Sequence, residues 1–242
     1  MWHVAGKVVL ITGASRGLGR VLAEVFAEHG AHLILCARRA DVLVGVEADL
    51  ARRGVPAMAE GCDVSVEEDV LRLVHRGVQR FGRIDVLINN ASILGRRAPV
   101  TEYPSEVWNE VLATNLTGAF RMSREVAHVM RRQGAGAIIN VSSSVGRKAR
   151  PNWGAYLVSK WALEGLSFMM AEELRNTGIR VNVVDPGGMR TGMRAAAYPA
   201  EDPTTLPMPR EVVPVFLYLA SDDSRDVTGE RFSAREFAGG AA

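Results

Sequence analysis

Short apolar runs alternate with longer amphipathic segments along this chain, and this alternation restricts the fold more than any other feature. Helical patterns occupy residues 17–29, 65–80 and 152–176, and two further ones end at residue 53 and near residue 132. The apolar runs occupy residues 7–12, 32–36, 55–61, 84–91, 137–143 and 180–186. Runs that are apolar almost throughout are typical of strands buried on both faces, so helices must cover both sides of a parallel sheet. The pattern predicts a three-layer α/β fold with a doubly wound parallel sheet.

The whole chain, residues 1–242, is expected to form a single domain. Chains of this length commonly build one large α/β core, and no linker, repeat or low-complexity tract interrupts the pattern. The exception is residues 189–210, where four prolines forbid a continuous helix or a central strand: Pro199, Pro203, Pro207 and Pro209. This segment is interpreted as a substrate loop or broken helical lid beyond the carboxyl edge of the sheet.

Composition and charge argue against several classes of protein. The 29 basic and 27 acidic residues are dispersed, with no basic tail or stripe, so nucleic acid is not an expected partner. No apolar run reaches the length of a membrane span, and the first residues do not resemble a signal peptide, so a cytoplasmic location is expected. The two cysteines, Cys36 and Cys62, are interpreted as buried free thiols rather than a disulfide, and no metal site is expected.

A glycine-rich turn, TGASRGLG, joins the first predicted strand to the first helix. Gly13, Gly17 and Gly19 remove side chains where a phosphate would approach backbone N–H groups at the positive end of a helix. Their spacing differs from the common G-x-G-x-x-G fingerprint, and a tight turn with a purely structural role is the alternative. Because the turn lies between a strand and a helix, a dinucleotide site is favoured.

The residues that follow the second strand indicate which dinucleotide is preferred. NAD sites usually place a carboxylate there for the ribose 2′-hydroxyl, but this chain has Arg38 and Arg39, with Asp41 as the first acid. A guanidinium suits a 2′-phosphate, and Arg16 in the glycine turn could approach the same group. NADP(H) is therefore predicted over NAD(H). The alternative is that both arginines cap the strand and face water.

In the stretch YLVSK, Tyr156 lies four residues before Lys160, a spacing that places both side chains on one face of a helix. The pair alone proves little. Taken in order, however, TGASRGLG, CDVS, NNAS, NLTG, INVSS, YLVSK, DPGG and ASDDSRDVTG resemble the short-chain dehydrogenase/reductase family over nearly the whole chain. The resemblance implies a Rossmann-type fold and hydride transfer between NADP(H) and a carbonyl compound or secondary alcohol.

The resemblance also implies the roles of individual residues. Tyr156 would be the general acid and base, Lys160 would lower its pKa and bind the nicotinamide ribose, Ser143 would hold the carbonyl oxygen, and Asn115 would anchor a relay water. Reduction of a ketone builds negative charge on oxygen, which explains why a proton donor and a polarising hydrogen bond are needed. The implied cofactor-binding residues are Gly13, Ser15, Arg16, Gly17, Leu18, Gly19, Arg38, Asp63, Val64, Asn90, Ala91, Tyr156, Lys160, Pro186, Gly187 and Thr191.

Some positions depart from the family pattern or leave alternatives open. Ser92 replaces the glycine of NNAG, which matters if that position needs a positive φ. The ending SAREFAGG replaces the commoner VDGG, which puts the last strand and its contacts between subunits in doubt.

The apolar helix 152–176 predicts a homodimer or homotetramer, with the helix ending near Arg132 at the same interface. The alternative function is a catalytically idle, dinucleotide-binding regulator.

Overall fold

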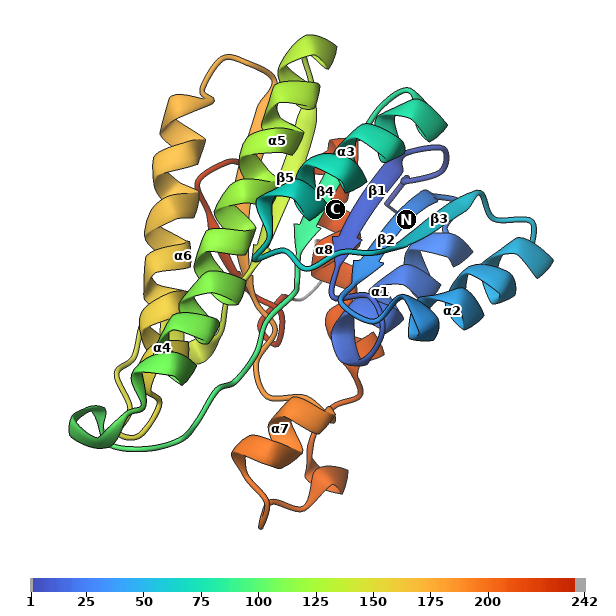
Figure 1. Ribbon diagram of the computed structural model, residues 1–242. Helices are drawn as coiled ribbons and strands as arrows, with labels where there is room; N and C mark the ends of the chain where they lie inside the picture. The colour runs from blue at the N-terminus through green and yellow to red at the C-terminus, as the bar shows by residue number, and fades with distance from the viewer. Residues whose placement is uncertain (1, 238–242) are drawn as a thin grey trace.

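A computed structural model describes residues 2–237 of the chain. Its centre is one parallel sheet in the order β3-β2-β1-β4-β5-β6-β7, and every strand pair in it is parallel. The strands are β1 (Val8–Thr12), β2 (His32–Ala37), β3 (Ala57–Gly61), β4 (Val86–Asn89), β5 (Gly136–Val141), β6 (Ile179–Asp185) and β7 (Arg231–Ser233). The predicted doubly wound parallel sheet is confirmed (Figure 1). β7 pairs with β6 despite the unusual ending, of which only residues 233–237 are described.

Helices cover both faces of this sheet. Successive strand residues point to opposite faces, and the apolar side chains on each face form a core with the helices on that side. Val9 and Ile11 enter one core with α1, α2 and α8, whereas Val8 and Leu10 enter the other with α3, α5 and α6 (Figure 1). The helices are α1 (Gly17–Glu28), α2 (Ala40–Arg52), α3 (Glu67–Phe81), α4 (Ser105–Leu112), α5 (Gly118–Gln133), α6 (Gly154–Glu173), α7 (Gly192–Ala197) and α8 (Pro214–Ala220). The predicted three layers are thus observed.

The helical pattern that ends near residue 132 contains an interruption that periodicity did not reveal. A π-helical segment, Ala113–Thr117, separates α4 from α5. Such a segment adds one residue to the turn and often marks a functional position. Its consequence here is that Asn115 faces the protein interior, where it is almost fully buried.

The proline-rich segment forms the short helix α7 and two further turns, Pro203–Thr205 and Pro209–Val212. Thr191 caps α7 by accepting a hydrogen bond from the backbone N–H of Arg194. The segment lies beyond the end of the sheet to which the strands point (Figure 1). Of the two predicted forms, loop or broken helix, the segment has the second, and its action as a substrate lid is a proposal.

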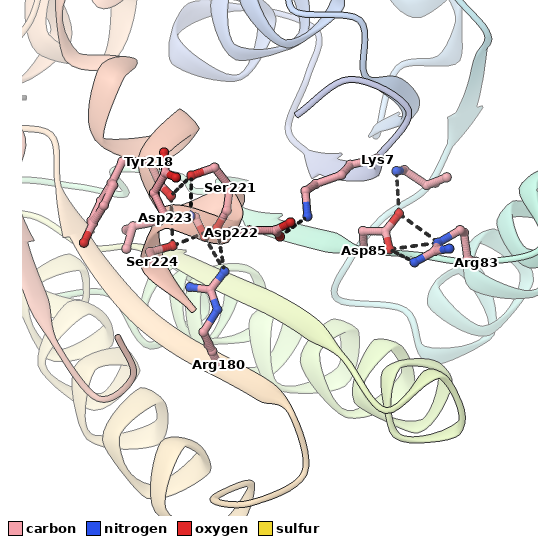
Figure 2. Close-up of polar contacts among 11 residues, drawn as sticks. Lys7, Arg83, Asp85, Arg180, Tyr218, Ser221, Asp222, Asp223 and Ser224 are labelled. Carbon is pink, nitrogen blue, oxygen red and sulfur yellow. Dashed lines mark hydrogen bonds and ion pairs between the residues drawn. The ribbon is translucent and has the colours of Figure 1, made fainter. Parts of the chain in front are cut away.

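Ion pairs and hydrogen bonds close the opposite, amino-terminal edge of the sheet (Figure 2). Lys7 pairs with Asp222 at 2.7 Å, and Asp85 accepts hydrogen bonds from the Val8 N–H and from Arg83. Arg180 donates to the backbone carbonyls that end α8 and follow it. These contacts link the starts of β1, β4 and β6 to neighbouring segments at this edge.

Cys36 and Cys62 are buried free thiols, as predicted. Within the described part of the chain, no helix is both long and apolar enough to cross a membrane.

Candidate active site

The glycine turn after β1 is packed so closely at Gly13 and Gly19 that a side chain is excluded at both positions. Gly13 and Gly17 have φ values of +68° and +57°, which glycine adopts without strain. A Cβ on Gly13 would lie 2.9 Å from the Cα of Ala91, and one on Gly19 would overlap the Gly13 carbonyl oxygen. The first N–H groups of α1 receive no side-chain cap, so they are available to an anion.

The residues that follow β4 hold this turn in place. The Asn90 side-chain amide donates to the Thr12 carbonyl at 2.8 Å, and the Ala91 N–H donates to Thr12 Oγ1 at 2.9 Å. Thr12 was not among the predicted site residues. A threonine at the end of a buried strand gives no signal in a sequence until its partner on the neighbouring strand is known.

Arg38 lies at the end of β2, where the 2′-phosphate of NADP(H) is expected. Its guanidinium is half exposed and lies 3.6 Å from the carboxylate of Glu110 on α4. Arg39 instead pairs with Asp41, and the Arg39 guanidinium holds the pKa of the Asp41 carboxyl below its usual range. Of the two arginines, Arg38 therefore has the more distant acidic partner, so its guanidinium is the freer one to bind a phosphate.

Asp63 and Gly187 begin two loops at the same edge of the sheet. Asp63 Oδ1 accepts hydrogen bonds from the N–H and hydroxyl of Ser65, which is the arrangement of a turn. Ser65 thus takes part in this turn, and α3 begins at Glu67 without a side-chain cap. Gly187 has a φ of +70°, and its N–H donates to Asp185. Both residues thus have structural roles in addition to the predicted cofactor contacts.

Tyr156 and Lys160 lie on the buried face of α6. Their exposed fractions are 7% and 2%, and Lys160 Nζ lies 5.5 Å from the centre of the Tyr156 ring. Lys160 Nζ donates to the Val141 carbonyl at the end of β5 at 2.8 Å. The structure therefore brings the predicted pair together at the carboxyl edge of the sheet, next to the loop that carries Ser143.

Burial shifts the pKa values of both groups toward their neutral forms. It raises the pKa of Tyr156 to about 12, and hydrogen bonding to Ser143 offsets part of this rise. It lowers the pKa of Lys160 to about 8, while the charge of Glu164 acts in the opposite direction. The expected lowering of the Tyr156 pKa is thus wrong for the protein alone, because the cost of burying a phenolate exceeds the stabilisation by its neighbours.

Asn115 is connected to the tyrosine through Ser159. Its amide donates to the Ile93 carbonyl at 3.0 Å and to Ser159 Oγ at 3.1 Å, and its Oδ1 accepts from the Ile93 N–H at 2.8 Å. Ser159 Oγ donates in turn to the Tyr156 carbonyl at 2.7 Å. The amide of Asn115 therefore ties the β4–α4 loop to the helix that carries Tyr156.

Glu164 is a site residue that the sequence alone did not indicate. It lies one helical turn after Lys160, and its side chain is only 4% exposed. Its carboxylate accepts hydrogen bonds from Ser142 at 2.6 Å, Arg147 at 2.9 Å and Arg231 at 3.0 Å. The only signal in the sequence was its position on the same helix face as Lys160.

Arg231 extends this network from the last strand. Its guanidinium also donates to Asp185 Oδ2 at 3.0 Å and to the Ser143 carbonyl at 3.3 Å. The backbone of the predicted catalytic serine is therefore held by a residue 88 positions away in the sequence.

Ser92 does not require the strained backbone that its glycine-like position suggested. Among residues 2–237, Asn152 and Asn176 are the non-glycine residues with positive φ, and Ser92 is not one of them. Its buried hydroxyl has no hydrogen-bond partner in the structure. In the same part of the chain, no group of His, Cys, Asp and Glu side chains is arranged to hold a metal ion.

The comparisons with known proteins agree with the fold. The family model for short chain dehydrogenases matches residues 7–202. The chain therefore belongs to the short-chain dehydrogenase family and is an oxidoreductase of that family.

Individual relatives match over nearly the full chain. This chain is 36% identical over 232 residues to the uncharacterized oxidoreductase YciK of Escherichia coli K12, and the match covers 95% of this chain and 92% of YciK. It is 37% identical over 239 residues to 3-oxoacyl-(acyl-carrier-protein) reductase FabG of Thermotoga maritima, covering 94% of this chain and 96% of FabG. A solved short chain dehydrogenase of Escherichia coli CFT073, complexed with NADPH, superposes with a TM-score of 0.90 at 36% identity, covering 96% and 98% of the two chains.

Proposed function

We propose that this protein is an NADP(H)-dependent carbonyl reductase, acting on a ketone or aldehyde and reversibly on a secondary alcohol. The observation that carries the proposal is the buried Tyr156–Lys160 pair beside Ser143, at the same sheet edge as the glycine turn. A proton donor, a cation and a hydroxyl placed together are what carbonyl reduction needs. The solved relatives complexed with NADP or NADPH support the choice of cofactor.

The residues present fit a dinucleotide. At Gly13 and Gly19 there is no room for a side chain, so the backbone is exposed to a ligand at these positions, and the uncapped start of α1 suits a pyrophosphate. We assign contacts in this region to Ser15, Arg16, Gly17 and Leu18. We assign the adenine side to Asp63 and Val64, and the nicotinamide side to Asn90, Ala91, Pro186, Gly187 and Thr191. NADPH bound there would supply the hydride.

The residues of the chain would manage the proton and the developing charge. With its pKa near 12, Tyr156 carries its proton at neutral pH and can donate it to a carbonyl oxygen. The Ser143 hydroxyl would donate a hydrogen bond to the same oxygen. Lys160, with its pKa near 8, would keep a positive charge beside the phenolate that forms, and Asn115 would hold the helix in position.

Cofactor preference is tested by replacing Arg38. We expect Arg38→Ala to weaken NADPH binding about tenfold and leave NADH binding nearly unchanged, because the variant cannot make a charge-assisted hydrogen bond to the 2′-phosphate. Glu110→Gln is the matched control: it removes the acidic partner 3.6 Å from Arg38, so NADPH binding should be unchanged or tighter. The measurement is fluorescence titration with both cofactors. An unaltered NADPH affinity in Arg38→Ala would refute this assignment.

We also propose a homo-oligomer that buries the outer faces of α5 and α6. Large apolar side chains are exposed on these helices: Phe120, Val158, Trp161 and Met169. Trp161 and Met169 are each about half exposed, which is unusual for side chains of this size on a monomer surface. Light scattering checks the proposal, and a monomer mass at all concentrations would contradict it. The mass from light scattering also distinguishes a dimer from a tetramer.

A further inference from the structure

A guanidinium that lies against two neighbouring aromatic rings is found beside the candidate active site. Arg97, from the loop after β4, places its Cζ 4.8 Å from the centre of the Trp153 ring and 5.0 Å from that of Tyr198. The Trp153 ring in turn lies 5.6 Å from the Tyr156 ring. One aromatic side chain therefore separates this positive charge from the predicted proton donor.

Contact with these two rings leaves donors of Arg97 free. Aromatic rings contact the faces of a guanidinium, whereas its N–H groups point outward from the edge. One of these N–H groups donates to the Ala197 carbonyl at 2.6 Å. Within residues 2–237, no carboxylate lies within ion-pair distance of Arg97, so its charge is not compensated by the protein.

Arg97 also lines a cavity of about 450 Å³ at this edge, together with Leu94, Asn152, Ala197 and Pro199. Asn152 adopts a φ of +65°, a conformation that non-glycine residues rarely adopt and that is often found at ligand sites. Its amide adds a donor and an acceptor to an otherwise apolar wall. The size and the mixed lining suit a small organic molecule with one polar end.

The other charges near the cavity do not cancel this one. Glu201 is an acid near Tyr198, but both of its carboxylate oxygens already accept hydrogen bonds from Arg194. Arg150 adds a second cation, which donates to the Tyr198 hydroxyl at 3.4 Å. The local balance is therefore positive and favours a ligand with negative charge.

From this arrangement we infer that the cavity binds an anionic group of the substrate, a carboxylate or phosphate, with Arg97 as the residue that recognises it. The inference rests on the proposed carbonyl reduction, because the reacting carbonyl must lie at Tyr156. A suitable substrate carries its anion about one aromatic ring away from the carbonyl. In the part of the chain that the structure describes, only one N–H group of Arg97 is engaged, with the Ala197 carbonyl, so a planar carboxylate can accept two hydrogen bonds from the others.

The test compares 4-acetylbenzoate with methyl 4-acetylbenzoate, because the two probes share the ketone and the ring and differ in charge. For the unaltered protein with NADPH, we expect kcat/KM to be about tenfold or more higher for the acid, mainly through KM. Arg97→Met should remove this preference while leaving the ester about as good a substrate as before. Arg97→Lys, which keeps a charge but not the planar fork, should retain part of it.

Arg96→Met serves as the matched control, since it removes a neighbouring exposed arginine and changes the net charge equally. It should keep the preference for the acid. If Arg97→Met and Arg97→Lys lower activity equally on both probes, Arg97 is only a structural clasp for α7, and the inference is wrong. If the unaltered protein reduces the ester as well as the acid, the anion site fails while the carbonyl reductase proposal stands.

Discussion

Tyr156→Phe is expected to lower kcat for carbonyl reduction by a factor of about 10² to 10⁴, the usual contribution of a positioned general acid. Phenylalanine keeps the ring that packs against Trp153 and removes only the hydroxyl that would donate the proton. The measurement is NADPH consumption with any carbonyl compound that the unaltered protein accepts. Turnover that survives unchanged would eliminate Tyr156 as the acid.

The control for this variant is cofactor binding measured without a carbonyl compound. Tyr156 is buried in the protein, and removal of its hydroxyl should leave the fold and most interactions with NADPH intact. We expect the affinity for NADPH to change by less than about threefold, because the variant lacks only a single neutral hydrogen bond. A catalytically idle regulator would show NADPH binding but no turnover even in the unaltered protein, which separates that alternative.

Glu164→Gln is expected to lower the free energy of unfolding by about 2 kcal/mol, because it weakens the charge-assisted hydrogen bonds from Ser142 and Arg231 in a buried network, although Asp185 still pairs with Arg231. The partner that matters is Arg231, whose side chain is only 17% exposed; Arg147 is half exposed and contributes less. Urea unfolding measures the change. The matched control is Glu172→Gln on the same helix, where the exposed pair with Arg175 should be worth less than about 1 kcal/mol.

The same variant should change the pH dependence of activity. The charge of Glu164 raises the pKa of Lys160, which burial lowers to about 8. Without that charge, Lys160 loses its proton at lower pH, so the alkaline limb of the kcat/KM profile should move to lower pH. An unmoved limb together with unchanged stability would show that Glu164 does not support the site.

Much of the fold could be predicted because it depends on local patterns. Strands buried on both faces produce apolar runs in the sequence. In the structure, the neighbouring residues Val8 and Val9 accordingly enter opposite cores. The π-helical segment at residues 113–117 was not predicted, since one extra residue hardly alters helical periodicity. Hydrogen bonds of Asn115 to Ile93 and Ser159 hold its amide inside the protein, and no local pattern predicts these distant partners.

The candidate site was predicted where a residue type and spacing carry the chemistry, as for Tyr156 and Lys160. Glu164 and Arg97 were missed because their roles depend on partners distant in sequence. Glu164 meets Arg231, 67 positions later, and Arg97 bonds the Ala197 carbonyl, 100 positions later. The pKa of Tyr156 was predicted in the wrong direction for a related reason, because the cost of burial depends on packing that no local motif records.

The hydrogen bond between Arg231 and the Ser143 loop has a consequence for the order in which the protein is made. A nascent chain that has emerged as far as α8 already contains Ser143, Tyr156 and Lys160, but not the guanidinium that binds Glu164 and the Ser143 carbonyl. β7 can add to the sheet only beside β6, so this strand completes both the core and the site. A chain that ends before Arg231 would therefore lack the hydrogen bonds that the last strand makes to Glu164 and to the Ser143 carbonyl.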